Sequence, residues 1–169
     1  MVTGMLNRIF PKQADNSYRG HWLGILLLAV VAFMKGSQGV VSVFDTRNAV
    51  TTADGIPLDS YGAAAGETVI ALTALGGFGL LVIALLGVVV LIRYRAMIPF
   101  MFLVQLIVQL GGRVLLEVNP IVRSAETSMG FAGHPVGFWL NLAILAVTLV
   151  GFVLSVQNKS SSDTAVLKK

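Results

Sequence analysis

The chain has 169 residues, of which 56% are hydrophobic and only 12% are charged, and its mean hydropathy of +0.83 lies outside the range of soluble domains. The formal net charge is +4. The basic residues are concentrated on one side of the predicted membrane spans, which argues against nucleic-acid binding. The absence of cysteine excludes disulfides, thiolate metal sites and dithiol redox chemistry.

Residues 1–20 are polar, with a short apolar patch that ends at Pro11. This pattern fits either one interfacial turn of helix or a loose cytoplasmic tail. A first membrane span is predicted at about residues 22–44. Because no small-residue cleavage site follows a short apolar core, we expect this span to be an uncleaved anchor and not a signal peptide.

Lys35 and Gln38 interrupt the second half of the first span. The lysine could snorkel to the surface from a helix that ends early, or it could point into the bundle. Residues 40–44 are apolar again and complete the roughly 20 residues that a bilayer requires. The pattern therefore favours an inward Lys35.

A polar loop at residues 45–62, with the turn formers Asp54-Gly55, leads to a second predicted span at about 63–92. This span is rich in glycine, including Gly62-x-x-x-Gly66 and the cluster Gly76, Gly77 and Gly79. Small residues let membrane helices approach closely. The alternative is that they only reflect the tolerance of membrane helices for glycine.

The turn Arg93-Tyr94-Arg95 is very short, so the third span, at about 97–118, is expected to lie antiparallel beside the second. It carries Gln105, Gln109, Arg113 and Glu117, each four residues after the last. This spacing places the four polar side chains along one slowly drifting stripe of a helix. Such groups are costly in lipid, so the stripe is predicted to face protein or a wet cavity.

A fourth span is predicted at about 136–156, with only Asn141, Thr148 and Ser155 as polar residues, and we expect it to face lipid or a partner helix. Residues 158–169 are expected to form a disordered cytoplasmic tail. The predicted fold class is therefore all-α: an integral membrane four-helix bundle formed by residues 21–157.

The positions of lysine and arginine predict the orientation of this bundle. Two basic residues flank the spans on one side, Arg47 and Arg123. The side that carries both termini has eight: Arg8, Lys12, Arg19, Arg93, Arg95, Lys159, Lys168 and Lys169. Both termini are thus predicted in the cytoplasm, with the two longer loops on the opposite side. His21 and His134 then lie on opposite sides, which argues against a bis-histidine haem.

The ionisable and amide groups of the first three spans are predicted to meet in the outer half of the membrane. The candidate cluster consists of Lys35, Gln38, Glu67, Gln105, Gln109, Arg113 and Glu117. We expect Arg113 to pair with Glu67, and Lys35 to pair with Glu117 or Glu67, because charges in a low-dielectric environment require partners.

Several roles are open for this cluster. It could only fix the register of the helices, or it could form a pocket that binds a lipid headgroup, a quinone ring or a small anion through Arg113. A proton or ion path lacks a further acidic residue toward the cytoplasm. A metal site of Glu67, Glu117 and His134 matches no known spacing, and a Schiff base at Lys35 is the weakest alternative. Neither metal nor haem is expected, while a bound lipid or quinone stays open.

The segment Leu58-Asp59-Ser60-Tyr61-Gly62-Ala63-Ala64, followed by an apolar helix, a basic turn and Leu110-Gly111-Gly112-Arg113, resembles the DoxX-like group of small four-helix bacterial membrane proteins. The resemblance covers roughly residues 22–156. This chain departs from it with Ser60 where an arginine is often expected, and with Lys35 and Glu67 inside spans. Some members of that group resemble subunits of quinone-linked oxidoreductases, so the resemblance implies a fold more than a reaction.

No nucleophile with an adjacent base is evident, so the sequence favours a protein that is not an enzyme. We expect an accessory or structural subunit that docks transmembrane helices of a larger respiratory, photosynthetic or transport complex, or a homo-oligomer. The alternative is a small lipid-, quinone- or anion-binding or transport protein that uses the polar cluster as its pocket.

Overall fold

The computed structural model describes residues 2–121 and 134–157, with side chains from residue 5 onwards. All secondary structure in these ranges is helical. The elements in chain order are α1 (Val2–Ile9), α2 (Leu23–Phe44), α3 (Thr46–Asn48), η1 (Ala49–Ala53), η2 (Leu58–Ser60), α4 (Ala63–Arg93), η3 (Arg95–Met97), α5 (Ile98–Val118) and α6 (Val136–Val156). The predicted tail at 158–169 and the basic residue Arg123 lie outside the described residues.

Four helices, α2, α4, α5 and α6, are long and apolar enough to cross a membrane, as the sequence predicts. At a rise of about 1.5 Å per residue, the 21 residues of α5 or of α6 extend for about 31 Å, which matches the hydrocarbon core of a bilayer. The 31 residues of α4 extend for about 46 Å by the same rise. α4 is therefore longer than a layer of that thickness, so at least one of its ends projects beyond it.

The ends of these helices follow local sequence signals. Pro99 lies in the first turn of α5, where its missing N–H leaves no hydrogen bond unmade. Pro135 immediately precedes α6 in an extended conformation. In the loop after α2, Gly55 has a φ of 69°, a left-handed conformation that glycine adopts at little cost. The predicted turn at Asp54-Gly55 is thus present.

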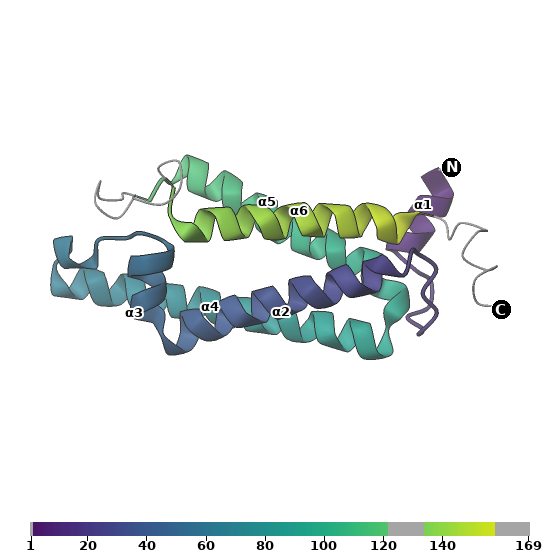
Figure 1. Ribbon diagram of the computed structural model, residues 1–169, viewed down its shortest axis with the longest axis horizontal. Helices are drawn as coiled ribbons and strands as arrows, with labels where there is room; N and C mark the ends of the chain where they lie inside the picture. Colours follow the sequence, from purple (N-terminus) through teal and green to yellow (C-terminus); the bar gives the residue numbers. More distant parts are fainter. Residues whose placement is uncertain (1, 122–133, 158–169) are drawn as a thin grey trace.

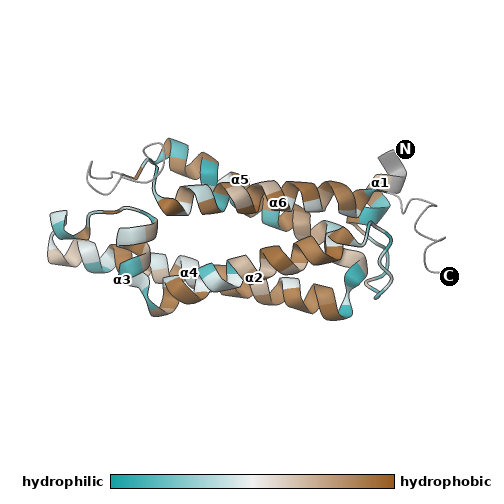
Figure 2. Cartoon of the chain, in the orientation of Figure 1, coloured by the Kyte–Doolittle hydropathy of each residue, from teal (hydrophilic) through white to brown (hydrophobic). Residues whose placement is uncertain are grey.

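The long helices form two layers (Figure 1), with α2 and α4 in one and α5 and α6 in the other. α2 packs extensively on α4, α6 packs on both α2 and α5, and α4 contacts α5 much less. Hydrophobic residues dominate the lengths of the helices, and hydrophilic residues gather toward their ends (Figure 2). We call the end that carries α1 and the last turn of α6 the terminal end, and the end that carries α3, η1 and η2 the loop end.

Small residues form the contact between α2 and α4. A Cβ atom at Gly77 would lie 2.5 Å from the Ser42 Cβ, and one at Gly39 would lie 2.9 Å from the Gly77 carbonyl oxygen. In contrast, a Cβ at Gly76 or Gly79 would meet no described atom within 4 Å apart from its chain neighbours and the nearby backbone of α4 itself. Close packing through small residues is therefore confirmed for Gly77, whereas Gly76 and Gly79 lie on the open face of the same helix.

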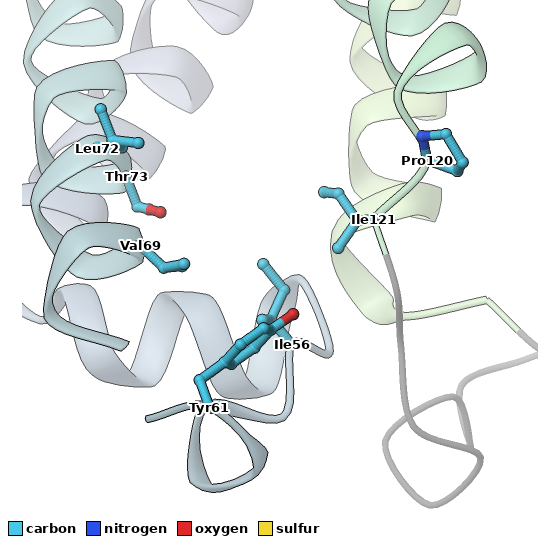
Figure 3. Close-up of a pocket in the computed structure, with 7 residues that line it drawn as sticks. All are labelled: Ile56, Tyr61, Val69, Leu72, Thr73, Pro120 and Ile121. Carbon is cyan, nitrogen blue, oxygen red and sulfur yellow. The ribbon is translucent and has the colours of Figure 1, made fainter. Parts of the chain in front are cut away.

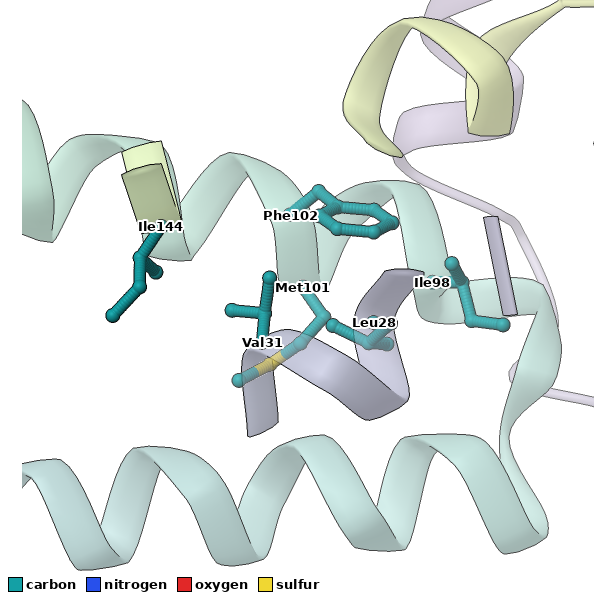
Figure 4. Packing of buried hydrophobic residues seen from close by; sticks show 6 residues of the cluster. All are labelled: Leu28, Val31, Ile98, Met101, Phe102 and Ile144. Carbon is teal, nitrogen blue, oxygen red and sulfur yellow. The ribbon is translucent and has the colours of Figure 1, made fainter. Parts of the chain in front are cut away.

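The main apolar core lies toward the terminal end (Figure 4). It comprises Leu28, Val31, Ile98, Met101, Phe102 and Ile144. The Phe102 ring fits against Gly151 of α6, at a position where a Cβ would collide with the ring. A smaller cluster of Val50, Ile56 and Leu58 holds the loop that follows α2. The two clusters fix opposite ends of the bundle.

The N-terminal segment folds back onto the terminal end. Of the two alternatives for residues 1–20, the structure contains the helix, α1, which packs beside α5 and α6. The Arg8 guanidinium donates a hydrogen bond of 2.9 Å to the carbonyl oxygen of Val156, at the end of α6. The Phe10 ring contacts the Phe100 ring, with 5.7 Å between the ring centroids. The segment is thus attached to the bundle at both residues.

Candidate functional site

Lys35 points into the protein, as favoured by the sequence. Its side chain is only 4% exposed, and its Nζ donates hydrogen bonds of 3.1 Å to the Gln38 Oε1 and of 3.1 Å to the Asn141 Oδ1. An ammonium group has three N–H donors. Within residues 5–121 and 134–157, Lys35 forms no ion pair with a carboxylate. The buried charge is therefore held by two neutral amide oxygens.

The Asn141 side chain on α6 is the partner that sequence reasoning missed, because we expected α6 to face lipid or a partner helix and expected carboxylates to pair with Lys35. Its Oδ1 accepts from Lys35 and, at 3.4 Å, from the Gln38 Nε2, and its Nδ2 donates to the Gly137 carbonyl at 2.9 Å. Asn141 is itself exposed, whereas Thr148 and Ser155 are buried. The sequence carried the signal, since Asn141, Thr148 and Ser155 are spaced by seven residues, which keeps them on one face of a helix.

Gln109 of α5 contacts the same face of α6. The Gln109 Nε2 donates to the Thr148 Oγ1 at 3.0 Å, and that hydroxyl donates to the Ile144 carbonyl at 2.6 Å. Gln105 is only 1% exposed. The Gln105 Nε2 and the Gln109 Oε1 are buried and have no hydrogen-bond partner among the residues described by the structure. We call the group formed by Lys35, Gln38, Gln105, Gln109, Asn141 and Thr148 the polar seam.

The three remaining residues of the predicted cluster lie outside the seam. The Arg113 guanidinium carbon lies 5.1 Å from the centroid of the Phe138 ring, in the range of a cation–π contact. Glu117 is exposed on α5. Glu67 pairs with Arg47 at 3.3 Å, and these side chains are 72% and 64% exposed.

The expected ion pairs of Arg113 with Glu67, and of Lys35 with Glu117 or Glu67, are therefore replaced by other contacts. The reason lies in the arrangement of the helices. α4 packs on α2 and scarcely on α5, so Glu67 lies near the end of α2 and meets Arg47. An ion pair this exposed contributes little to stability, typically about 0–1 kcal/mol.

His134 joins an aromatic group at the start of α6. Its ring stacks on the Phe138 ring, with 4.3 Å between the centroids and an interplanar angle of 17°, and Trp139 packs edge-on against Phe138. Within the described parts of the chain, no three acidic or histidine side chains come close enough to hold a metal ion. His134 therefore packs as an aromatic ring in this structure.

A groove of about 480 Å³ opens at the loop end, between α4 and the segment that follows α5 (Figure 3). Val69, Leu72 and Thr73 of α4 line one side, and Pro120 and Ile121 line the other. Tyr61 and Ile56 form its floor toward the loop. The surface is mainly apolar. Sequence reasoning did not predict this groove, because it arises from the separation of two helices that are neighbours in the sequence.

Comparisons with protein-family models, with curated proteins and with solved structures find no match to this chain. The resemblance to the DoxX-like group thus stays a prediction. Four long apolar helices fit a multi-pass membrane protein.

Proposed function

We propose that the chain is a multi-pass protein of a bacterial inner membrane, with both termini in the cytoplasm. The four apolar helices support the membrane location. Among the described residues that flank these helices, Arg8, Lys12, Arg19, Arg93 and Arg95 lie toward the terminal end, and Arg47 lies toward the loop end. An excess of lysine and arginine marks the cytoplasmic side of membrane proteins.

Within that membrane, we propose a binding protein whose ligand presents an oxygen acceptor to Lys35. The observation that carries this proposal is the ammonium group of Lys35, which is buried and, among the residues that the structure describes, has two acceptors, both neutral. A buried charge costs several kcal/mol unless its partners compensate. A carboxylate or a quinone carbonyl could accept the third N–H, and hydrogen bonds to a charged group are the stronger ones.

The amides of α5 support a ligand in the same seam. A buried donor or acceptor that lacks a partner costs about 1–3 kcal/mol, and the seam contains one of each, the Gln105 Nε2 and the Gln109 Oε1. Amide groups can orient a ligand that has both donors and acceptors. The seam has no carboxylate or imidazole to act as a general base, which supports binding without catalysis.

The test is a titration of the detergent-solubilised protein with two probes, a short-chain ubiquinone analogue and laurate, followed by native mass spectrometry. Wild type is expected to bind at least one probe. Lys35→Met should weaken that binding by about 10- to 100-fold, because it removes a charge-assisted hydrogen bond of about 1.5–3 kcal/mol. Arg47→Met, at the exposed pair, is the control and should bind as wild type does. Equal binding by wild type and Lys35→Met, or no binding of either probe by wild type, would contradict the proposal.

A second candidate is the accessory subunit expected from the sequence. The apolar groove between α4 and the end of α5 favours it, together with the exposed apolar residues along α4, such as Leu72, Leu75 and Phe78. Lipid chains would cover these surfaces equally well, so this candidate ranks second. Extraction from the native membrane in mild detergent tests it: a stoichiometric second polypeptide supports a subunit, and a chain that migrates alone or as a homodimer contradicts it.

A further inference from the structure

A second polar site lies at the terminal end, away from the seam. The segment between α1 and α2 is fixed there by backbone hydrogen bonds: the Ala96 N–H donates to the Asp15 carbonyl at 3.1 Å, and the His21 N–H donates to the Leu154 carbonyl at 3.2 Å. A pocket of about 420 Å³ lies between this segment and Ala96 of η3. This volume is in the range of small-ligand sites.

The lining of this pocket is strongly basic. It includes Arg8, Lys12 and Arg19, and one acidic residue, Asp15. The Asp15 carboxylate accepts the Ser17 N–H at 3.0 Å, and this hydrogen bond lowers the pKa of Asp15 below its ordinary value. Asp15 is therefore ionised at neutral pH, and the four side chains carry a net charge of two positives. Phosphate is an anion that arginine and lysine bind well.

Apolar side chains adjoin this basic pocket. Met5 and Leu6 of α1 and the following Phe10 are exposed. Arg8, which lies in the same segment, lines the pocket. Trp22 and Tyr94 are exposed at the same end of the bundle, and aromatic residues of this kind mark the level of lipid headgroups. A short helix with apolar residues on one side and cations beside them is typical of a helix that lies in the membrane interface.

We propose that this pocket binds the phosphate headgroup of an anionic phospholipid, whose acyl chains extend along the apolar residues of α1. Basic pockets on the cytoplasmic side of membrane proteins bind such headgroups. Lys12 and Arg19 supply the charge for recognition, and Arg8 is anchored to the end of α6 by its bond to Val156. The inference rests on the membrane location proposed above, and it is independent of any ligand in the polar seam.

The experiment measures phospholipid binding to the full-length protein by native mass spectrometry, with phosphatidylglycerol and phosphatidylcholine as probes. Wild type should prefer phosphatidylglycerol. The double variant Lys12→Gln/Arg19→Gln should bind phosphatidylglycerol about 10- to 30-fold more weakly. Each basic residue near an anionic surface raises the affinity about fivefold. The single Lys12→Gln variant should lose a smaller factor, and it guards against a fold defect in the double variant.

The matched control is Arg93→Gln/Arg95→Gln, which removes the same charge at the same end but from residues that do not line the pocket. It should retain affinity within about threefold. If both double variants lost the same affinity for phosphatidylglycerol, the attraction would be diffuse and the proposed site would be overturned. The proposal would also be overturned if neither variant lost affinity. Inorganic phosphate that displaces the lipid at equal concentration would assign the pocket to a soluble anion and also overturn the proposal. A Lys35→Met variant should bind phosphatidylglycerol as wild type does, which separates this test from that of the seam.

Discussion

In the described part of the chain, the ammonium group of Lys35 donates hydrogen bonds to two neutral side chains. Sequence reasoning assigned it a carboxylate, because acids are the usual partners of buried cations. In the structure the amides of Gln38 and Asn141 take that place. The hydrogen bond from Lys35 to Asn141 joins α2 to α6, whereas the one to Gln38 lies within α2. Together they leave the positive charge itself uncompensated by any described carboxylate.

The contribution of Asn141 to this arrangement can be measured. Asn141→Leu is expected to lower the free energy of unfolding by about 1–3 kcal/mol, because it removes an acceptor from a buried charge. In a Lys35→Met background the same substitution should cost less than about 1 kcal/mol, since no charge is left to satisfy. Unfolding in mixed detergent micelles gives both values. Equal costs in the two backgrounds would show that the two residues are not coupled.

Tyr18 provides a test at alkaline pH. Burial raises the pKa of Tyr18 from 10.0 to about 12, and its hydroxyl is buried without a partner. Because the folded state favours the protonated phenol, this contribution to stability is fully present below pH 10 and is lost as the pH rises toward 12. The difference in tyrosinate absorbance between wild type and Tyr18→Phe isolates the titration. A midpoint near 10 would mean that the phenol is solvated.

At the scale of elements, α2 and α4 pack through small residues and α5 carries a stripe that drifts. Each step of four residues advances about 40° beyond a full turn of helix. Over the three steps from Gln105 to Glu117, the direction in which the side chain leaves the helix axis therefore rotates by about 120°. This rotation explains why Gln105 is buried and Glu117 is exposed. Steps of seven residues drift by only about 20°, so Asn141, Thr148 and Ser155 of α6 stay on one face.

Adjacent glycines of α4 allow a matched test of the contact between α2 and α4. Gly77→Leu is expected to destabilise the protein by about 1–3 kcal/mol, because its side chain would overlap Ser42 and force the helices apart. Gly76→Leu places the same side chain on the open face, where a Cβ meets no described atom of another helix within 4 Å, and should change stability by no more than about 0.5 kcal/mol. Thermal unfolding in detergent compares the two. Similar melting temperatures would contradict the packing scheme.

At the scale of the whole molecule, the two layers converge on a core at the terminal end and leave the groove at the loop end. α4 and α5 follow one another in the sequence, yet α4 packs on α2 and α5 packs on α6. The polar seam therefore runs between α6 and its two neighbours, and the expected meeting of charges from α4 and α5 does not occur.

The proposed orientation can be tested directly, because the chain has no cysteine of its own. Ala14→Cys lies at the terminal end and Asp59→Cys at the loop end, and both positions are exposed. In cells with a permeabilised outer membrane, an impermeant maleimide should label Asp59→Cys at once. It should label Ala14→Cys only after the inner membrane is disrupted. The opposite order would invert the orientation, and labelling of both at once would contradict the predicted topology.

The sequence by itself determined the four apolar helices and the inward direction of Lys35. Composition, periodicity and the cost of polar groups in hydrocarbon act locally along the chain, and they require no knowledge of which helices are neighbours. The tertiary structure alone decided the partners: Asn141 for Lys35, Arg47 for Glu67 and Thr148 for Gln109. Partner choice depends on which helix faces meet, and that depends on the fit of side chains such as Gly77 against Ser42 across segments distant in the sequence.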